Sequence, residues 1–397
     1  LTEDNYLKVA VGWNRINLEI LGVWPEPRDT ESLFSSYRFL IPAFLVAGCI
    51  CLPQGLALYF VWNDVTLFCE IISTAWIPCT NAFVKLLFVR YRPLRSLLQS
   101  FYYDWKQNNP KDVHEIMMDG ARRTKTISIM CTTVTQAMVL LFIFMRIGQL
   151  IGTERNTDNH IQLLIYKGYS PLDMTRALTV ILSNICQVVA ALYSTISYTG
   201  VDSFVCMLVI HACTQLSTFR LKLDNLFGKI CRLQSTDLFR KELGSIIKRH
   251  EHLIWYANTL EECFNSFLLF QLLLNTCQIC FETFQAVASG TGSFLAYSFY
   301  VLESVFIISH IYLYCYMGEM LLTQNAKIAK YAYETEWYNA RSDEAKTIIM
   351  LSCRSTIPLR FTAGKFGTFS IEMFSTVSIY CSMGYLSVLL TVTNFGD

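Results

Sequence analysis

Seven long apolar stretches alternate with polar, charged segments along the chain. Each is long enough for an α-helix, which rises about 1.5 Å per residue, to cross a hydrocarbon layer of about 30 Å. The pattern therefore predicts an all-α membrane protein with seven transmembrane helices. The predicted spans are Phe39–Val61, Val65–Val89, Ile127–Leu150, Ala177–His211, Phe264–Ala288, Phe294–Leu322 and Thr368–Val392.

Several polar segments beside these spans also carry apolar residues at helical spacing. Pro93 opens one predicted helix, which ends near Pro110, and Thr236–Leu260 leads helically into the fifth span. We expect these extensions to form a cytoplasmic bundle in which subunits pack against one another. The alternative is a set of solvated surface helices in a monomer.

The arm before the first span, residues 1–36, holds apolar residues from Trp13 to Trp24 around a polar centre. This predicts a short amphipathic helix, ended by Pro25 and Pro27, on the cytoplasmic surface of the membrane. No internal repeat or second domain is visible, so we expect residues 1–397 to form a single domain.

Charge supports a membrane protein and orients it. Hydrophobic residues make up 53% of the chain and charged residues only 16%, against about 25% in soluble domains. Most Lys and Arg fall in four segments: the N-terminal arm, the loop between spans two and three, Arg220–Arg249 and Lys327–Lys365. The positive-inside rule then predicts a cytoplasmic N-terminus and an extracellular C-terminus. The net charge of +1 gives no basic field for a nucleic-acid partner.

The last predicted span is unusually rich in hydroxyls, which are spread round its whole circumference. Hydroxyls that reach neither water nor a partner are costly in lipid, so this helix is expected to face protein or water. The residues are Ser370, Ser375, Thr376, Ser378, Ser382, Ser387, Thr391 and Thr393.

Ionisable residues within the predicted spans are the strongest single-residue signals, because each is costly in the bilayer. Each of them could form an ion pair that only stabilises the bundle, or could take part in function. Lys85 and Glu372 lie near cytoplasmic ends, where we expect their side chains to reach the interface. The set is Glu70, Lys85, Arg146, Asp202, Glu282, Glu303 and Glu372.

Catalytic and metal-binding patterns are missing from the sequence. His250-Glu251-His252 has too short a spacing for a helical zinc site, and we interpret it as a solvated cytoplasmic face. No glycine-rich phosphate loop and no nucleophile elbow is present. We therefore expect no enzyme activity, no catalytic residue, no metal and no cofactor.

The outer halves of the spans are rich in aromatic and sulfur side chains at helical spacing. An apolar cavity with a few hydroxyls suits a small volatile or lipid-like ligand, and ordinary helix packing is the alternative for each residue. The loop Gly152–Leu172 is placed to cap such a cavity. The candidate ligand-binding residues are Ile72, Trp76, Met138, Phe142, Met145, Ile185, Val189, Tyr193, Tyr297, Tyr300 and Ser304.

The C-terminal third carries three specific patterns: Lys327-Ile-Ala-x-x-Ala-Tyr-Glu-x-x-Trp337-Tyr338, Phe361-Thr-Ala-Gly-Lys-Phe366, and Ser370-Ile-Glu-Met-Phe374. With the inverted seven-span topology, the chain resembles the insect odorant receptors over essentially its full length. It resembles their divergent odorant-binding subunits more than the odorant co-receptor, whose long second cytoplasmic loop has no room here.

The resemblance implies a non-selective, ligand-gated cation channel of four subunits. In this arrangement the chain binds an odorant or pheromone and co-receptor subunits complete the pore. The expected place is the plasma membrane of sensory-neuron dendrites, in contact with the lipid bilayer.

The resemblance also implies a division of the chain. Residues 37–325 would hold helices one to six with the ligand pocket, and 326–367 a cytoplasmic anchor segment. Within it the cytoplasmic half of the seventh helix would run from about Ser342 to Pro358. Residues 368–393 would form its pore-lining half, gated by Val388 and Val392 with Thr391 beside them.

Three alternative functions fit the sequence less well. A gustatory-type receptor channel fits less well, because its final pattern starts Thr-Tyr where this chain has Gly384-Tyr385. A G-protein-coupled receptor has an extracellular N-terminus, the opposite of the predicted orientation. A transporter is expected to show paired broken helices in two related halves, and none is visible.

Overall fold

The computed structural model describes residues 3–25, 37–89, 93–107, 109–152, 163–170, 172, 174, 176–230, 236–289, 294–335, 337–339, 341–364, 366–377, 384 and 387. Within these residues, six helices are long and apolar enough to cross a membrane, and they correspond to the first six predicted spans. Most of the seventh predicted span, including Val388, Thr391 and Val392, lies outside the described residues.

The first two spans are each interrupted by a short π-helix. Span one consists of α3 (Leu40–Val46), η1 (Ala47–Cys51) and α4 (Leu52–Phe60), and span two of α5 (Val65–Ile71), η2 (Ile72–Trp76) and α6 (Ile77–Phe88). A proline, Pro53 or Pro78, directly follows the first residue after each π-helix. Because proline cannot donate to the ladder and crowds the preceding turn, a widened turn relieves both problems.

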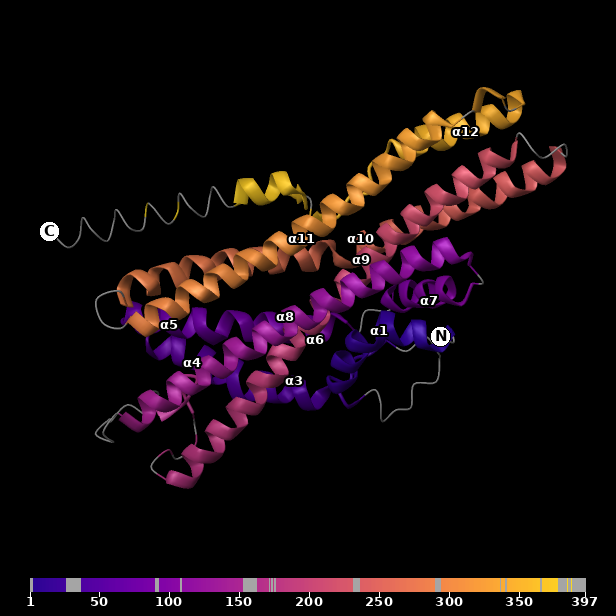
Figure 1. Cartoon of the computed structure of the whole chain (residues 1–397). Coiled ribbons are helices and arrows are strands. Elements are labelled where there is room, and N and C mark those ends of the chain that lie inside the picture. Colours follow the sequence, from indigo (N-terminus) through magenta and orange to yellow (C-terminus); the bar gives the residue numbers. More distant parts are fainter. Residues whose placement is uncertain are drawn as a thin grey trace.

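The remaining spans belong to four long helices that run along the length of the molecule (Figure 1). They are α8 (Lys111–Gly152), α9 (Ala177–Ile230), α10 (Thr236–Ser289) and α11 (Phe294–Glu334). With 54 residues, α9 is about 80 Å long, far more than a bilayer is thick. The predicted helical extensions are therefore confirmed, as is the separate helix opened by Pro93, α7 (Pro93–Lys106).

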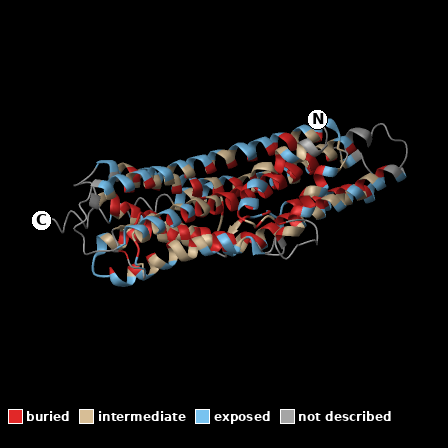
Figure 2. Cartoon of the chain, turned by 90° about the horizontal axis from the view of Figure 1, so that it is seen from below, coloured by how far each residue is buried: buried red, intermediate tan, exposed pale blue. Residues whose placement is uncertain are grey.

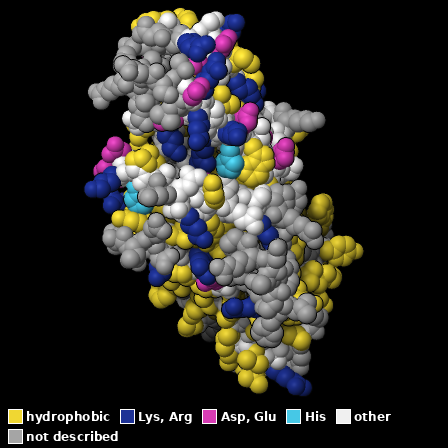
Figure 3. Space-filling view, turned by 90° about the vertical axis from the view of Figure 1, so that its right-hand side faces the viewer, with side chains coloured by type: hydrophobic (Ala, Val, Ile, Leu, Met, Phe, Trp, Pro, Cys, Tyr) yellow, Lys and Arg dark blue, Asp and Glu magenta, His cyan; other side chains and the backbone are white. Residues whose placement is uncertain are grey.

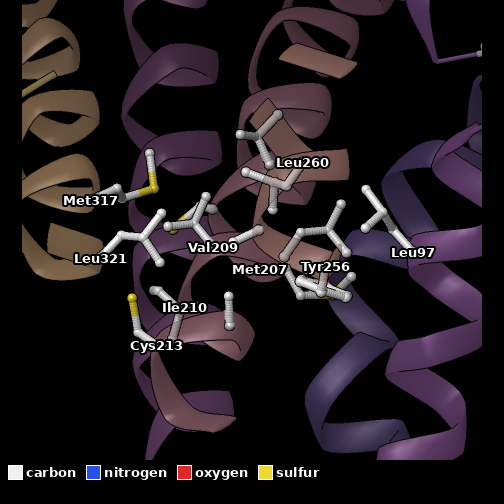
Figure 4. Close-up of a cluster of buried hydrophobic side chains, with 14 of the residues drawn as sticks. Leu97, Met207, Val209, Ile210, Cys213, Tyr256, Leu260, Met317 and Leu321 are labelled. Carbon is white, nitrogen blue, oxygen red and sulfur yellow. The ribbon is translucent and has the colours of Figure 1, made fainter. Parts of the chain in front are cut away.

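The centre of the bundle is the middle of α9, where every residue from 197 to 216 is buried. Helices α7, α10 and α11 pack around it, and Figure 4 shows side chains from all four elements meeting there. Buried residues follow the inner sides of the long helices, while exposed residues cover their outer sides (Figure 2). A helix that is apolar on all sides suits this central position.

The N-terminal helix is part of this bundle. Helix α1 (Glu3–Ile20) packs against α8 and α9, and Leu18 and Leu21 have no exposed surface. The predicted amphipathic helix is therefore present with one face packed on the bundle, and its place on the membrane surface stays a prediction. The predicted stop at Pro25 is wrong, because the helix already ends before Gly22, whose φ of +68° favours glycine.

Charged residues cross-link α7, α9 and α10. The carboxylate of Asp104 lies 2.8 Å from the Arg249 guanidinium and 3.1 Å from His211 Nε2. Burial by itself would raise the pKa of Asp104, but hydrogen bonds and charge from His211 and Arg249 lower it to about 2. Figure 3 shows Lys, Arg, Asp and Glu gathered over the upper half of one end face.

The interpretation of His250 and His252 as a solvated face is wrong. His250 is buried, stacks on Phe219 at 5.3 Å and shares a hydrogen bond of 3.0 Å with Ser355. His252 Nε2 lies 3.2 Å from Ser100 Oγ. Both histidines therefore join separate helices, and the partner of His250 comes from α12 (Ser342–Ser355), which follows the short 3₁₀ helix η4 (Trp337–Asn339).

A small hairpin connects α12 to the last described helical turns. Strands β1 (Thr362–Ala363) and β2 (Gly367–Thr368) pair antiparallel, with Thr362 opposite Thr368. Gly364 has a φ of +60°, and a Cβ there would lie 2.7 Å from Leu269. The expected helix start at Thr368 is therefore wrong, because Phe369 N still bonds to Phe361 O at 2.8 Å, and the helix begins at 371.

Candidate functional site

A cavity of about 100 Å³ lies within the helical bundle, between residues of η2, α6, α8, α9, α10 and α11. Its wall is mainly apolar and contains five aromatic rings: Phe142, Tyr166, Tyr198, Phe299 and Phe306. Enclosed, mostly apolar spaces with a few oriented polar groups are typical of small-molecule sites.

The π-helix η2 shapes one wall of this cavity. Thr74 lies in the middle of η2, and Pro78 and Cys79 follow in α6; all three line the space. An α-helix would advance 100° per residue, whereas the wider turn changes which side chains share a face. The altered turn therefore helps to set the group of side chains that a ligand would meet.

The segment 163–170 closes another wall. Gln187 forms two hydrogen bonds of 3.0 Å with the backbone of Tyr166, and Arg146 donates to the carbonyls of Leu164 and Ile165 at 3.2 and 3.1 Å. These bonds hold the Tyr166 ring 5.1 Å from that of Phe142. This described part of the predicted loop Gly152–Leu172 thus contributes Tyr166 directly to the cavity wall.

A network of buried polar groups adjoins the cavity through Tyr198. Asp202 accepts from Lys85 at 2.5 Å and from Tyr314 at 2.5 Å, and His310 Nε2 lies 2.7 Å from the same carboxylate. Tyr198, which lines the cavity, has its hydroxyl 2.9 Å from His310 Nδ1. The expectation that Lys85 reaches the interface is wrong, because its side chain has no exposed surface and this network satisfies it.

The network continues to the start of the seventh span. The Tyr314 ring lies 5.9 Å from that of Phe369, and Gly318, one turn further along α11, lies directly against the Phe369 backbone. Glu319 also accepts a hydrogen bond of 3.3 Å from Ile371 N. Packed side chains therefore join the cavity to the residues that begin the last span.

The hairpin is attached to α10 as well. Glu261 Oε2 accepts from Thr362 N at 2.8 Å, and Asn265 donates to the Thr362 hydroxyl at 3.1 Å. Phe361 and Phe369 are buried beside it. The pattern Phe361-Thr-Ala-Gly364 thus supplies one buried ring, one hydrogen-bonding threonine and the glycine of a tight turn, and Phe369 adds a second buried ring after β2.

Of the residues expected to bind ligand, Met138 and Phe142 line the cavity. Tyr300 lies at its edge beside Thr74. Ser304 instead donates to Glu282 at 3.1 Å. The side chains of Ile185, Val189 and Tyr297 are exposed on the outside of the bundle, while Ile72, Trp76, Met145 and Tyr193 are buried or half-buried without forming the cavity wall.

Several residues of the wall were not among the expected set, including Thr74, Tyr198, Phe299, Phe306, Gln278 and Glu303. Glu303 was visible in the sequence as a carboxylate inside a predicted span. The others carry no separate signal, because the spans are apolar all round and hydrophobic periodicity does not separate a lipid-facing side from a cavity-facing one.

The remaining ionisable groups are accommodated in different ways. Glu70 pairs with Lys167 at 2.6 Å, and Arg146 is held by carbonyl groups and by Gln149 Oε1 at 2.6 Å. Glu372 is exposed. Glu282 and Glu303 both lie near the amide of Gln278, at 2.7 and 3.5 Å.

Comparison with known proteins agrees with this architecture. Residues 65–380 match the family described as 7tm Odorant receptor. The chain is 24% identical to Odorant receptor 13a of Drosophila melanogaster over 94% of both chains. It is 26% identical to the Odorant receptor coreceptor of Aedes aegypti over 35% of this chain and 29% of that one.

A solved structure has the same fold. The olfactory receptor OR5 from Machilis hrabei matches with a TM-score of 0.81 over 98% of this chain and 99% of that chain, at 16% sequence identity. The same receptor in complex with eugenol matches with a TM-score of 0.80. With the family match extending over most of its length, this all-α membrane protein belongs to the 7tm odorant receptor family of insects.

Proposed function

We propose that this chain is the odorant-sensing subunit of a ligand-gated cation channel that it forms with odorant co-receptor subunits. The observation that carries the proposal is the path of packed side chains from the cavity to the last span, through Tyr198, Asp202, Tyr314 and Phe369. A ligand in the cavity touches the first of these residues. The family is one of receptor channels and not of enzymes.

In this proposal a ligand opens the channel because it binds more tightly to the open state than to the closed state. Met138, Phe142 and Tyr300 contact the ligand. The last span lines the pore, and Val388 and Val392, one turn apart with Thr391 beside them, close it by excluding water. Val388→Ala is then expected to change leak or conduction modestly, since each chain supplies one of four pore helices.

The proposed assembly is a tetramer with co-receptor subunits in the plasma membrane of sensory dendrites. The N-terminus is cytoplasmic and the C-terminus extracellular, as supported by the distribution of Lys and Arg between connecting segments. The orientation is tested with an N-terminal epitope tag in intact cells. A tag that antibodies reach before permeabilisation contradicts it.

The function is tested by whole-cell recording from cells that express this chain with the co-receptor, while G-protein signalling is blocked. We expect an odorant panel to evoke cation currents under the block. The control is the co-receptor alone, which is expected to answer only to its own direct agonist. Loss of every odorant response under the block, with agonist currents intact, contradicts a ligand-gated channel.

A further inference from the structure

We propose that the odorant bound in this cavity is a small, mainly apolar alcohol or phenol whose hydroxyl donates a hydrogen bond to Glu303. The inference rests on the proposed function and specifies the chemical class of its ligand. It depends on which polar groups of the cavity wall already have hydrogen-bond partners and which do not.

Most polar groups of the wall are already hydrogen-bonded within the protein. The Thr135 hydroxyl donates to a backbone carbonyl at 2.8 Å, and that of Thr195 accepts from Gln136 at 2.8 Å. Ser194 donates to the Cys79 sulfur at 3.4 Å. With the Tyr198 hydroxyl held by His310, these groups form the wall without needing a ligand.

Glu303 is different. Its Oε1 is the more distant of two carboxyl oxygens near the Gln278 amide, at 3.5 Å against 2.7 Å for Glu282. Its Oε2 is removed from solvent and has no hydrogen-bond partner among the described residues. Lys85 and Lys167 are paired with other carboxylates, Asp202 and Glu70. A buried acceptor without a donor is costly, so a ligand that supplies the donor gains that free energy on binding.

Thr74 completes the match. Its hydroxyl lies beside the Tyr300 hydroxyl but forms no hydrogen bond of normal geometry. A ligand hydroxyl both donates and accepts, so it satisfies Glu303 and can accept from Thr74. An ether, ester or ketone only accepts, so it supplies no donor to the unpartnered Glu303 Oε2.

The aromatic wall selects the rest of the molecule. Phe299 lies 5.7 Å from Phe142, and Phe306 stacks on His310 at 6.2 Å, so rings surround the space on several sides. Such walls bind compact apolar groups through dispersion and offset stacking. The expected ligand is therefore one polar hydroxyl on a compact hydrocarbon skeleton.

The test uses matched trios on aromatic and aliphatic skeletons: benzyl alcohol, 2-phenylethanol, 4-methylphenol and 1-hexanol, each with its methyl ether and its amine. Currents are recorded from cells that express the chain with the co-receptor. We expect alcohols or phenols to be at least tenfold more potent than their ethers. In Glu303→Met, which removes the acceptor, this advantage is expected to fall to less than threefold.

Two variants separate charge from hydrogen bonding. Glu303→Gln keeps an acceptor oxygen, so alcohol potency is expected to stay within about threefold, whereas an amine held by charge would lose at least tenfold. Glu334→Met, at an exposed position of the same helix, is the matched control and should leave all potencies unchanged. Surface expression and currents from the co-receptor's direct agonist report folding.

Ethers as potent as alcohols, or unchanged alcohol potency in Glu303→Met, would overturn the inference. Amines as the most potent class, with their loss in Glu303→Gln, would overturn it in favour of a cationic ligand. If no compound evokes current while the direct agonist does, the result instead contradicts the proposed odorant-sensing function.

Discussion

Asp202→Asn is expected to destabilise the protein strongly, because it leaves the Lys85 ammonium buried without a countercharge. The Lys85 side chain has no exposed surface, and its charge is met by Asp202 at 2.5 Å. Breaking a buried ion pair by removing one partner costs about 3–5 kcal/mol. The other contacts of Lys85, the Tyr198 carbonyl at 3.2 Å and the Tyr198 ring at 3.5 Å, carry no formal charge.

Lys85→Met is expected to cost less. In that variant Asp202 keeps His310 Nε2 at 2.7 Å and the Tyr314 hydroxyl at 2.5 Å. The double variant Lys85→Met/Asp202→Asn buries no charge from this pair, so it should be more stable than Asp202→Asn alone. Replacing both partners of a buried pair is often neutral or stabilising.

The measurement is equilibrium unfolding of the detergent-solubilised protein, for both single variants and the double variant. Glu334→Gln is the control, because the Lys330–Glu334 pair has side chains 75% and 53% exposed and is worth about 0–1 kcal/mol. Additive costs in the double variant, or a cost for Asp202→Asn below about 1 kcal/mol, would refute the reasoning.

Three further predictions concern other regions. Gly318→Ala is expected to reduce odorant currents and surface expression, because a Cβ there meets the backbone at the start of the last span; Gly244→Ala, whose Cβ meets nothing within 4 Å, is the control. Asp104, with a pKa lowered to about 2 by His211 and Arg249 against its burial, stabilises the fold above pH 4 and loses that contribution as pH falls from 4 to 2. Thermal unfolding of Asp104→Asn should therefore depend less on pH in this range, and an identical pH dependence contradicts the assignment. Phe142→Ala enlarges the cavity and is expected to lower potency for the smallest ligands about tenfold while sparing bulkier ones, as dose–response curves on one homologous series will show.

The sequence predicted the positions of the spans better than their contacts. The second span was expected at Val65–Val89, and its helices cover Val65–Phe88. Length and hydropathy determine such boundaries locally. In contrast, Lys85 was expected at the interface because it lies near the cytoplasmic end of its span. Its partner Asp202 is 117 residues away, and no local pattern joins the two residues.

The cavity was predicted in region but only partly in residues. Met138 and Phe142 line it, whereas Ile185 is 54% exposed on the outside of the same bundle. When the lipid-facing and inner sides of a span are equally apolar, hydrophobicity does not show which side chains face the cavity. In the second span, the wider turn of η2 also rotates the side chains that follow it about the helix axis. Sequence periodicity does not reveal this turn.

The hairpin of residues 361–369 has a mechanical consequence. It is bonded to α10 through Glu261 and packed against α11 beside Gly318, so the base of the last span has a fixed point of support. A helix held at one end moves chiefly by tilting about that end. In the proposed channel, where a helix of about 35 Å leads from this base to Val392, a tilt of about 5° would move the far end by about 3 Å. The supported base would then be the pivot that converts small adjustments beside the cavity into a larger displacement at the proposed gate.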